Sequence, residues 1–256
     1  MTGSYEPILA AIFGLFIGSF LNVCIYRMPR NESIVFPASK CPSCGVKIKP
    51  WDNIPVLSWI ILGRKCRQCN QLISVRYPVV ELLSGLLALA MLYRFGPTPS
   101  FVIYYFWSCA LLVITFIDID YQIIPDSLSI GGIFVGLALV WWLPISLKES
   151  LIGLAAGAGL LIVVIYGYLF LTGKEGMGGG DVKLLGMIGV FTGWEGVLFT
   201  IFMGSLTGTL VSLPWAIFRK KDMQTAIPFG PFLALGALIF VLWGDVFIDW
   251  YFGILA

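Results

Sequence analysis

Two aspartates lie at the borders of apolar segments, where a carboxylate is rare and is a candidate for function. Asp118 ends an apolar run that begins near residue 100, and Asp181 follows the glycine run 178–180. Each glycine costs a helix about 1 kcal/mol relative to alanine. We therefore expect one helix to end near Gly173 and the next to begin at Asp181, whose side chain would cap it. Two facing aspartates can hold a water molecule and share one proton, so this pair could hydrolyse a peptide bond.

The two expected helix ends favour different charge states for these aspartates. Asp181 begins a helix, where the positive end of the helix dipole favours a carboxylate, whereas Asp118 ends one, where the negative end disfavours it. We expect Asp181 to hold the negative charge and Asp118 to hold the shared proton.

Each acidic residue also has a purely structural interpretation. Asp118 alone could be a helix-end carboxylate, Asp181 alone a helix cap, and Asp126, which follows Pro125, is suited to cap the next helix. Asp120 lies about 200° round the helix from Asp118, so these two do not share a face. An ion-coupled transporter also places acids between broken helices and is the alternative function from another class. The candidate substrate-binding or supporting residues are Gly178, Gly180, Lys183, Asp120, Asp126 and Glu81.

Four of the six cysteines form two Cys-x-x-Cys pairs. These are Cys41 with Cys44 and Cys66 with Cys69. The spacing predicts a structural zinc site in which four thiolates complete a tetrahedron and leave no open position. The alternative is a pair of redox motifs. The remaining two cysteines, Cys24 and Cys109, lie in apolar runs and are expected to be buried small side chains.

The composition is that of a polytopic membrane protein. The 256 residues are 59% hydrophobic and 12% charged, whereas soluble domains have about 25% charged residues. The absence of histidine excludes a histidine-based triad and histidine metal ligands. No basic residue precedes the first apolar run, so we expect residues 7–27 to remain as a membrane helix instead of being cleaved as a signal peptide.

The apolar segments predict an all-α fold of about eight transmembrane helices, with a small zinc-ribbon-like insertion between the first two. A spanning helix needs about 20 apolar residues, and the sixth segment is shorter, so it is expected to be tilted or re-entrant. The segments lie at about 7–27, 77–95, 100–118, 128–145, 150–172, 182–194, 197–218 and 229–251.

The basic residues predict the orientation. In an eight-span arrangement 14 of the 16 basic residues fall on one side, including the region between the first two spans, Lys174, Lys183 and residues 219–221. The positive-inside rule makes that side cytoplasmic. We therefore expect three parts: a first transmembrane helix (1–27), a cytoplasmic zinc-binding domain (28–76) and a transmembrane aspartic peptidase domain (77–256). The middle part is too small to fold securely without a metal.

Several motifs, in this order, resemble the prepilin peptidases, also called type IV leader peptidases, which are membrane aspartic proteases with a Gly-x-Gly-Asp motif. Residues 30–33 depart from the family, which tends to be more apolar there. The motifs are GSFLNV at 18–23, YRMP at 26–29, the paired Cys-x-x-Cys, YPVVEL at 77–82, the aspartate segment 118–126, GGGDVK at 178–183 and IPFGPF at 227–232.

The resemblance implies a bifunctional enzyme of the bacterial inner membrane. Such an enzyme removes the basic leader from type IV prepilins and type II secretion pseudopilins at the cytoplasmic face. It then methylates the new N-terminal residue with S-adenosylmethionine. The catalytic roles fall on Asp118 and Asp181, and the zinc ligands on the four paired cysteines. The expected partners are prepilins, pseudopilins and the lipid bilayer, with no nucleic acid. An enzyme that cleaves without methylating is the alternative within this family.

Overall fold

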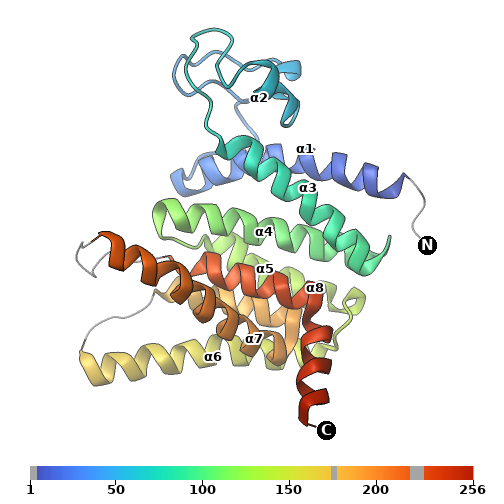
Figure 1. The fold of residues 1–256 in the computed structure, drawn as a ribbon, viewed down its shortest axis with the longest axis vertical. Helices are drawn as coiled ribbons and strands as arrows, with labels where there is room; N and C mark the ends of the chain where they lie inside the picture. The colour runs from blue at the N-terminus through green and yellow to red at the C-terminus, as the bar shows by residue number, and fades with distance from the viewer. Residues whose placement is uncertain (1–4, 174–177, 220–227, 256) are drawn as a thin grey trace. The chain divides into compact units, whose positions relative to one another are not determined.

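The computed structural model describes residues 5–173, 178–219 and 228–255, and helices account for most of them (Figure 1). The chain divides into two compact units, Met1–Val113 and Ile114–Ala256, with the division inside helix α4. The α-helices are α1 (Glu6–Arg27), α2 (Leu57–Ile61), α3 (Arg76–Phe95), α4 (Pro99–Tyr121), α5 (Asp126–Leu139), α6 (Leu147–Thr172), α7 (Gly179–Arg219) and α8 (Gly230–Leu255), and three short 3-10 helices are Met28–Arg30, Pro50–Asn53 and Val140–Trp142.

In the first unit, α1 and α3 pack closely through small residues. A Cβ on Gly14 would lie 2.8 Å from the Cα of Gly85, and a Cβ on Gly18 would lie 2.6 Å from the Cα of Glu81. Small residues at such a crossing allow two membrane helices to approach closely. The side chain of Asn22 also joins the pair, because its amide donates to the carbonyl of Tyr77 at 3.1 Å. Figure 1 shows the two helices side by side.

The cysteine-containing segment 31–75 links α1 to α3 and is anchored to both. The buried guanidinium of Arg27 donates to the carbonyls of Ser33 and Pro37, at 2.8 and 2.7 Å. On the other side, Glu81 Oε2 accepts the backbone N–H of Val56 at 2.7 Å. The segment holds α2, one 3-10 helix and two isolated β-bridges. Two buried charged residues of the membrane helices therefore hold the segment near its start and at its middle.

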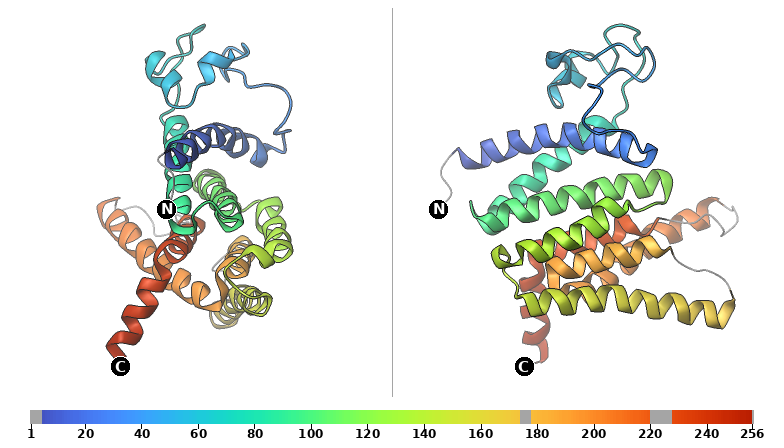
Figure 2. Two further views of the ribbon diagram at one scale, coloured as in Figure 1. Left: turned by 90° about the vertical axis from the view of Figure 1, so that its right-hand side faces the viewer. Right: turned by 180° about the vertical axis from the view of Figure 1, so that it is seen from behind.

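In the second unit, α6 runs beside the first half of α7 (Figure 2). The two backbones meet at Gly153 and Gly189, where a Cβ on either glycine would lie 2.1 Å from the carbonyl oxygen of the other. Ser150 donates to the carbonyl of Val190 at 2.7 Å and strengthens the same crossing. α7 bends at Gly193, which has φ 69° and ψ −175°, a conformation that glycine adopts readily.

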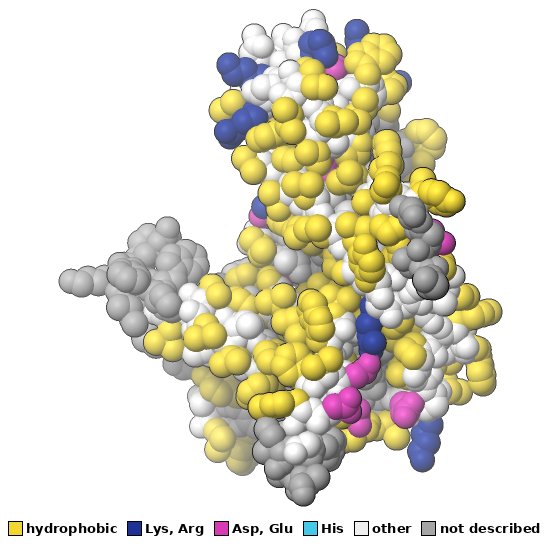
Figure 3. Space-filling view, turned by 45° about the vertical axis from the view of Figure 1, so that its right-hand side comes forward, with side chains coloured by type: hydrophobic (Ala, Val, Ile, Leu, Met, Phe, Trp, Pro, Cys, Tyr) yellow, Lys and Arg dark blue, Asp and Glu magenta, His cyan; other side chains and the backbone are white. Residues whose placement is uncertain are grey.

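The prediction of an all-α polytopic membrane protein is confirmed. Within the described residues, six helices are long and apolar enough to cross a membrane, and Asp126–Trp142 is a shorter apolar segment. The expected sixth and seventh segments are both helical and meet at the non-helical Gly193, so they form the two halves of α7 and count as one candidate span; the fourth is too short to count. Hydrophobic side chains cover much of the face drawn in Figure 3, as expected of a surface in contact with lipid.

Three expected helix boundaries can be compared with the structure. α6 ends at Thr172 and Gly173 adopts φ 68°, which confirms the expected end. α4 continues to Tyr121, so Asp118 lies in its last turn instead of at its end. α7 begins at Gly179, so Asp181 is its third residue and not its cap, contrary to the prediction. Gly176, Met177, Lys174, Lys220, Lys221 and Ile227 lie outside the described residues.

Candidate active site and candidate metal centre

Asp118 lies in the last turn of α4 and is only 5% exposed. Its Oδ2 accepts the backbone N–H of Gly230, the first residue of α8, at 3.0 Å. A Cβ on Gly230 would lie 2.7 Å from that same oxygen. Residue 230 must therefore lack a side chain for the carboxylate to receive this N–H, which is one of the unpaired donors at a helix start.

Asp181 lies in the first turn of α7 in the same unit, near enough to Asp118 for the two carboxyl groups to interact electrostatically. Gly180 lets this turn approach the link between α4 and α5, because a Cβ on it would lie 3.1 Å from the Cβ of Ile124. Gly178 precedes the helix and its carbonyl accepts the N–H of Asp181 at 3.3 Å. The structure thus brings together the two aspartates that the sequence singled out, from helices far apart in the chain.

An ion pair links the starts of α5 and α7 beside these aspartates. Lys183 Nζ lies 2.7 Å from Asp126 Oδ1. Asp126 is the first residue of α5, where the cap position is taken by Pro125, so its carboxylate bonds Lys183 and not its own helix end. Two of the expected supporting residues therefore hold one another and fix the first turn of α7 relative to α5.

The remaining acidic candidates are Asp120 and Glu81. Asp120 is exposed, whereas Asp118 is buried, in agreement with their different faces of α4. Glu81 belongs to the first unit, where it is 6% exposed and bonded to Val56.

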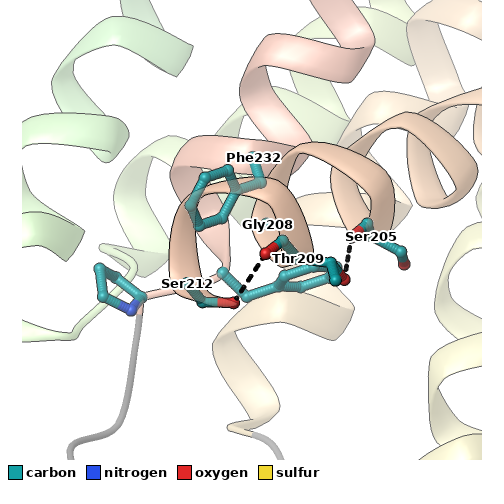
Figure 4. A pocket seen from close by; sticks show the side chains of 7 residues that line it. Ser205, Gly208, Thr209, Ser212 and Phe232 are labelled. Carbon is teal, nitrogen blue, oxygen red and sulfur yellow. Dashed lines mark hydrogen bonds between the residues drawn. The ribbon is translucent and has the colours of Figure 1, made fainter. Parts of the chain in front are cut away.

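An open pocket of about 280 Å³ lies between the second half of α7 and the start of α8 (Figure 4). Phe232 forms one wall, and the hydroxyls of Thr209 and Ser212 donate to carbonyls of their own helix. The hydroxyl donors of Thr209 and Ser212 are therefore satisfied within α7. The pocket includes Pro228 and Phe229, which directly precede Gly230, so it is at the same end of α8 as Asp118. Its full lining is Ser205, Gly208, Thr209, Ser212, Pro228, Phe229 and Phe232.

The four paired cysteines come together in the first unit. Their sulfur atoms all lie within 4.8 Å of one another, and the Sγ atoms of Cys41 and Cys69 are 3.8 Å apart. A tetrahedral zinc ion with bonds of about 2.3 Å requires sulfurs about 3.8 Å apart. Four convergent sulfurs can hold a metal, and this donor set fits zinc.

Two matching turns present these sulfurs. In the first, Gly45 N–H donates to the carbonyl of Cys41 at 2.9 Å; in the second, Asn70 N–H donates to that of Cys66 at 3.0 Å. Gly45 and Asn70 occupy the same place and have φ 70° and 57°, and glycine and asparagine are the residues that tolerate this conformation best.

The first turn also favours the metal-binding form of its cysteine. The backbone N–H of Cys44, aided by that of Ser43, lowers the pKa of Cys41 to about 6, and the thiolate is the form that binds metal. Nearby, Arg67 donates to both oxygens of Asp52 and lowers the pKa of that carboxyl group. This bidentate pair ties the second cysteine turn to the 3-10 helix Pro50–Asn53. Cys24 and Cys109 are buried, as expected.

Sequence reasoning missed two residues that shape these sites. Gly230 was noticed only as part of the motif at 227–232, and its contact with Asp118 joins positions 112 residues apart. Arg27 appears in the sequence only as part of the motif at 26–29, yet it is 8% exposed and holds the cysteine-containing segment. A glycine directly before a proline at a helix start is the one sequence signal that pointed to position 230.

The aspartate pair and the helical fold suit a membrane-embedded aspartic peptidase, and comparison with known proteins shows this class. Residues 12–95 match the family described as "Bacterial Peptidase A24 N-terminal domain", and residues 105–213 match the family described as "Type IV leader peptidase family". The chain belongs to the type IV leader peptidase family. This membership supports the peptidase interpretation over the transporter alternative.

Several curated relatives carry the name prepilin leader peptidase/N-methyltransferase. The relative from Pseudomonas putida is 36% identical over 96% of this chain and 93% of its own length. The relative from Pseudomonas aeruginosa is 37% identical over 91% and 89%, and that from Legionella pneumophila 35% over 96% and 94%. No solved structure matches the chain.

Proposed function

We propose that this protein cleaves the leader peptide from prepilins with Asp118 and Asp181 as its catalytic residues, and then methylates the new N-terminus. The observation that carries the proposal is the convergence of two aspartates from α4 and α7, one of them buried and bonded to the N–H of Gly230. Family membership supplies the substrate class, since the relatives are named for prepilin.

The geometry suggests how the pair would work. One carboxylate takes a proton from a water molecule as that water attacks the scissile carbonyl carbon, and the other aspartic acid protonates the carbonyl oxygen. The tetrahedral intermediate then breaks its C–N bond, and the amine leaves with a proton from the pair. Because Asp118 Oδ2 already accepts the Gly230 N–H, we assign the shared proton to its Oδ1 when Asp118 is protonated. Which aspartate carries the charge at rest stays a prediction.

The substrate and the setting follow from the membrane location. A prepilin or type II secretion pseudopilin would place its basic leader at the cytoplasmic face and its apolar helix in the bilayer. The charge distribution supports this orientation, with the active site and the cysteine-containing segment on the cytoplasmic side of a bacterial inner membrane. The division into residues 1–27, 28–76 and 77–256 is part of this proposal.

The cysteine cluster is proposed to hold a structural zinc ion. Cys41, Cys44, Cys66 and Cys69 would supply all four ligands, and zinc bound in this way stabilises a fold without opening a position for substrate. S-adenosylmethionine would be the methyl donor, in keeping with the names of the relatives.

The whole proposal is tested by incubating the purified protein with a prepilin and S-adenosylmethionine and weighing the products. The expected product lacks the leader and is heavier by one methyl group than the product formed without the donor. Cleavage with no added methyl group would leave a peptidase and remove the methyltransferase activity from the proposal.

Reversing the charge of Lys183 tests the role of the ion pair with Asp126. Lys183→Asp should lower the cleavage kcat about fivefold, because an exposed pair contributes at most about 1 kcal/mol, and KM should stay unchanged. The swap Asp126→Lys with Lys183→Asp restores the pair in the opposite sense and should recover activity to within about twofold. A swap as slow as the single variant would show that the two residues do not act through each other.

Removal of zinc should loosen the cysteine-containing segment alone. With a chelator, or in Cys41→Ser, amide hydrogen exchange should rise across residues 38–74, because metal binding supplies the folding free energy of such small sites. Exchange in α6, α7 and α8 should not change. Ser43→Ala, a substitution beside the ligands, should behave like the wild type. Unchanged exchange in the segment after complete zinc removal would contradict a structural metal.

A further inference from the structure

The short helix α2 carries an apolar face that the described residues of its unit leave open to solvent. Leu57, Ile60 and Ile61 follow the i, i+3, i+4 spacing that places residues on one helix face, and their exposed fractions are 57%, 61% and 76%. The opposite side is bonded inward, because Ser58 donates to the carbonyl of Trp51 at 3.0 Å and Trp59 Nε1 donates to that of Ile73 at 3.3 Å. The helix is therefore held in one orientation with its apolar face outward.

The start of α2 is fixed beside a membrane-spanning helix. Val56, the residue before α2, donates its N–H to Glu81 Oε2 at 2.7 Å. Glu81 lies in the second turn of α3, inside the candidate span Arg76–Phe95, and is 6% exposed. Glu81 is five residues beyond Arg76, the start of that span, and five residues of helix rise by about 8 Å. This is the depth of the boundary between lipid headgroups and acyl chains. Val56 adopts φ 61°, which is unfavourable for a β-branched residue, so the bond to Glu81 fixes a position that the local backbone disfavours.

The surroundings of this face are basic and aromatic. Residues 28–75 contain seven basic and two acidic residues, and one of those acids, Asp52, is paired with Arg67. Arg64 lies over the ring of Trp59 at 5.3 Å, and Lys49 over that of Trp51 at 5.5 Å. Most of the dark blue side chains in Figure 3 lie at the top of the view, where this segment is. Basic residues with tryptophan beside an apolar face are the composition of a helix that lies in the membrane interface.

We propose that α2 lies in the bilayer interface, with Leu57, Ile60 and Ile61 among the acyl chains and Arg64 and Lys65 on anionic phospholipid headgroups. The occupant of the open face is then lipid, because the tether to Glu81 sets the depth and the net positive charge selects an acidic surface. This contact would hold the cysteine-containing segment against the membrane and is independent of whether the protein cleaves prepilins.

A photo-crosslinking residue at position 61 tests this contact in the full-length protein. The protein is reconstituted in nanodiscs of phosphatidylcholine with one third phosphatidylglycerol, irradiated, and analysed by mass spectrometry. We expect phospholipid adducts at position 61, with a ratio of phosphatidylglycerol to phosphatidylcholine adducts about fivefold higher than the ratio of the two lipids in the disc, which corresponds to about 1 kcal/mol. The matched position is Ser43, which is exposed on a cysteine turn of the same segment and should give few lipid adducts.

A second variant separates the apolar contact from the charge. With Arg64→Gln and Lys65→Gln added, lipid adducts at position 61 should persist but the enrichment of phosphatidylglycerol should disappear, and circular dichroism would establish that the variant is folded. Lipid adducts without any enrichment in the parent protein would overturn recognition of anionic lipid. Adducts to a protein chain, or equal lipid labelling at positions 43 and 61, would overturn the membrane contact itself.

Discussion

Replacing either aspartate of the pair by asparagine should abolish leader cleavage. Asp118→Asn and Asp181→Asn should each lower the initial rate by about a thousandfold or more, because a positioned acid–base group contributes about 10² to 10⁴ in rate. The double variant should be little slower than either single variant, since residues that act as a unit do not contribute additively. The test is the initial rate of cleavage of a purified prepilin by each of the three variants and the wild type, all reconstituted in the same bilayer.

The matched control for these variants is Asp249→Asn, an exposed aspartate in α8, which should keep wild-type activity. Co-purification of uncleaved prepilin measures substrate binding by the two inactive variants. A variant that binds but does not cleave has lost the chemistry and kept the fold. If one asparagine variant cleaved normally while the other did not, the two residues would not form a shared pair.

Adding a methyl group at position 230 should damage the site almost as severely. In Gly230→Ala the new Cβ would lie 2.7 Å from Asp118 Oδ2, well inside van der Waals contact, so the carboxylate or the start of α8 must move. A displacement of about 1 Å at a reacting group can cost about a hundredfold. We expect a fall of about that size in kcat.

Gly253→Ala provides the comparison for that substitution. It lies in the same helix, and a Cβ there meets no atom within 4 Å, so alanine should leave cleavage unchanged and should slightly favour the helix. Wild-type activity in Gly230→Ala would mean that the N–H of residue 230 does not support Asp118.

The sequence was sufficient to single out the residues of both candidate sites, because such side chains are rare at those positions. Asp118 and Asp181 stand out because acids at membrane borders are costly, and the cysteines because their spacing has few other uses. Gly193, at which α7 bends, lies one residue before position 194, where the sixth segment was expected to end. In these cases a local pattern carries the information.

Contacts between distant parts of the chain could not be predicted from those patterns. The bond from Gly230 to Asp118 depends on α8 returning beside α4, and the pairing of Lys183 with Asp126 joins residues 57 positions apart. The glycines before Asp181 were expected to stay outside the helix. Gly179 and Gly180 belong to it, so Asp181 is the third residue of α7 and not its cap. Packing between helices outweighs the small intrinsic cost of those glycines.

The most direct test of the central claim is the mass of a prepilin after incubation with the purified wild-type protein and, separately, with Asp181→Asn. The wild type should yield two fragments whose masses add up to the substrate plus one water, cut between the basic leader and the apolar helix, and Asp181→Asn should return the substrate intact. Cleavage at the same bond by both proteins would contradict a mechanism that depends on the aspartate pair.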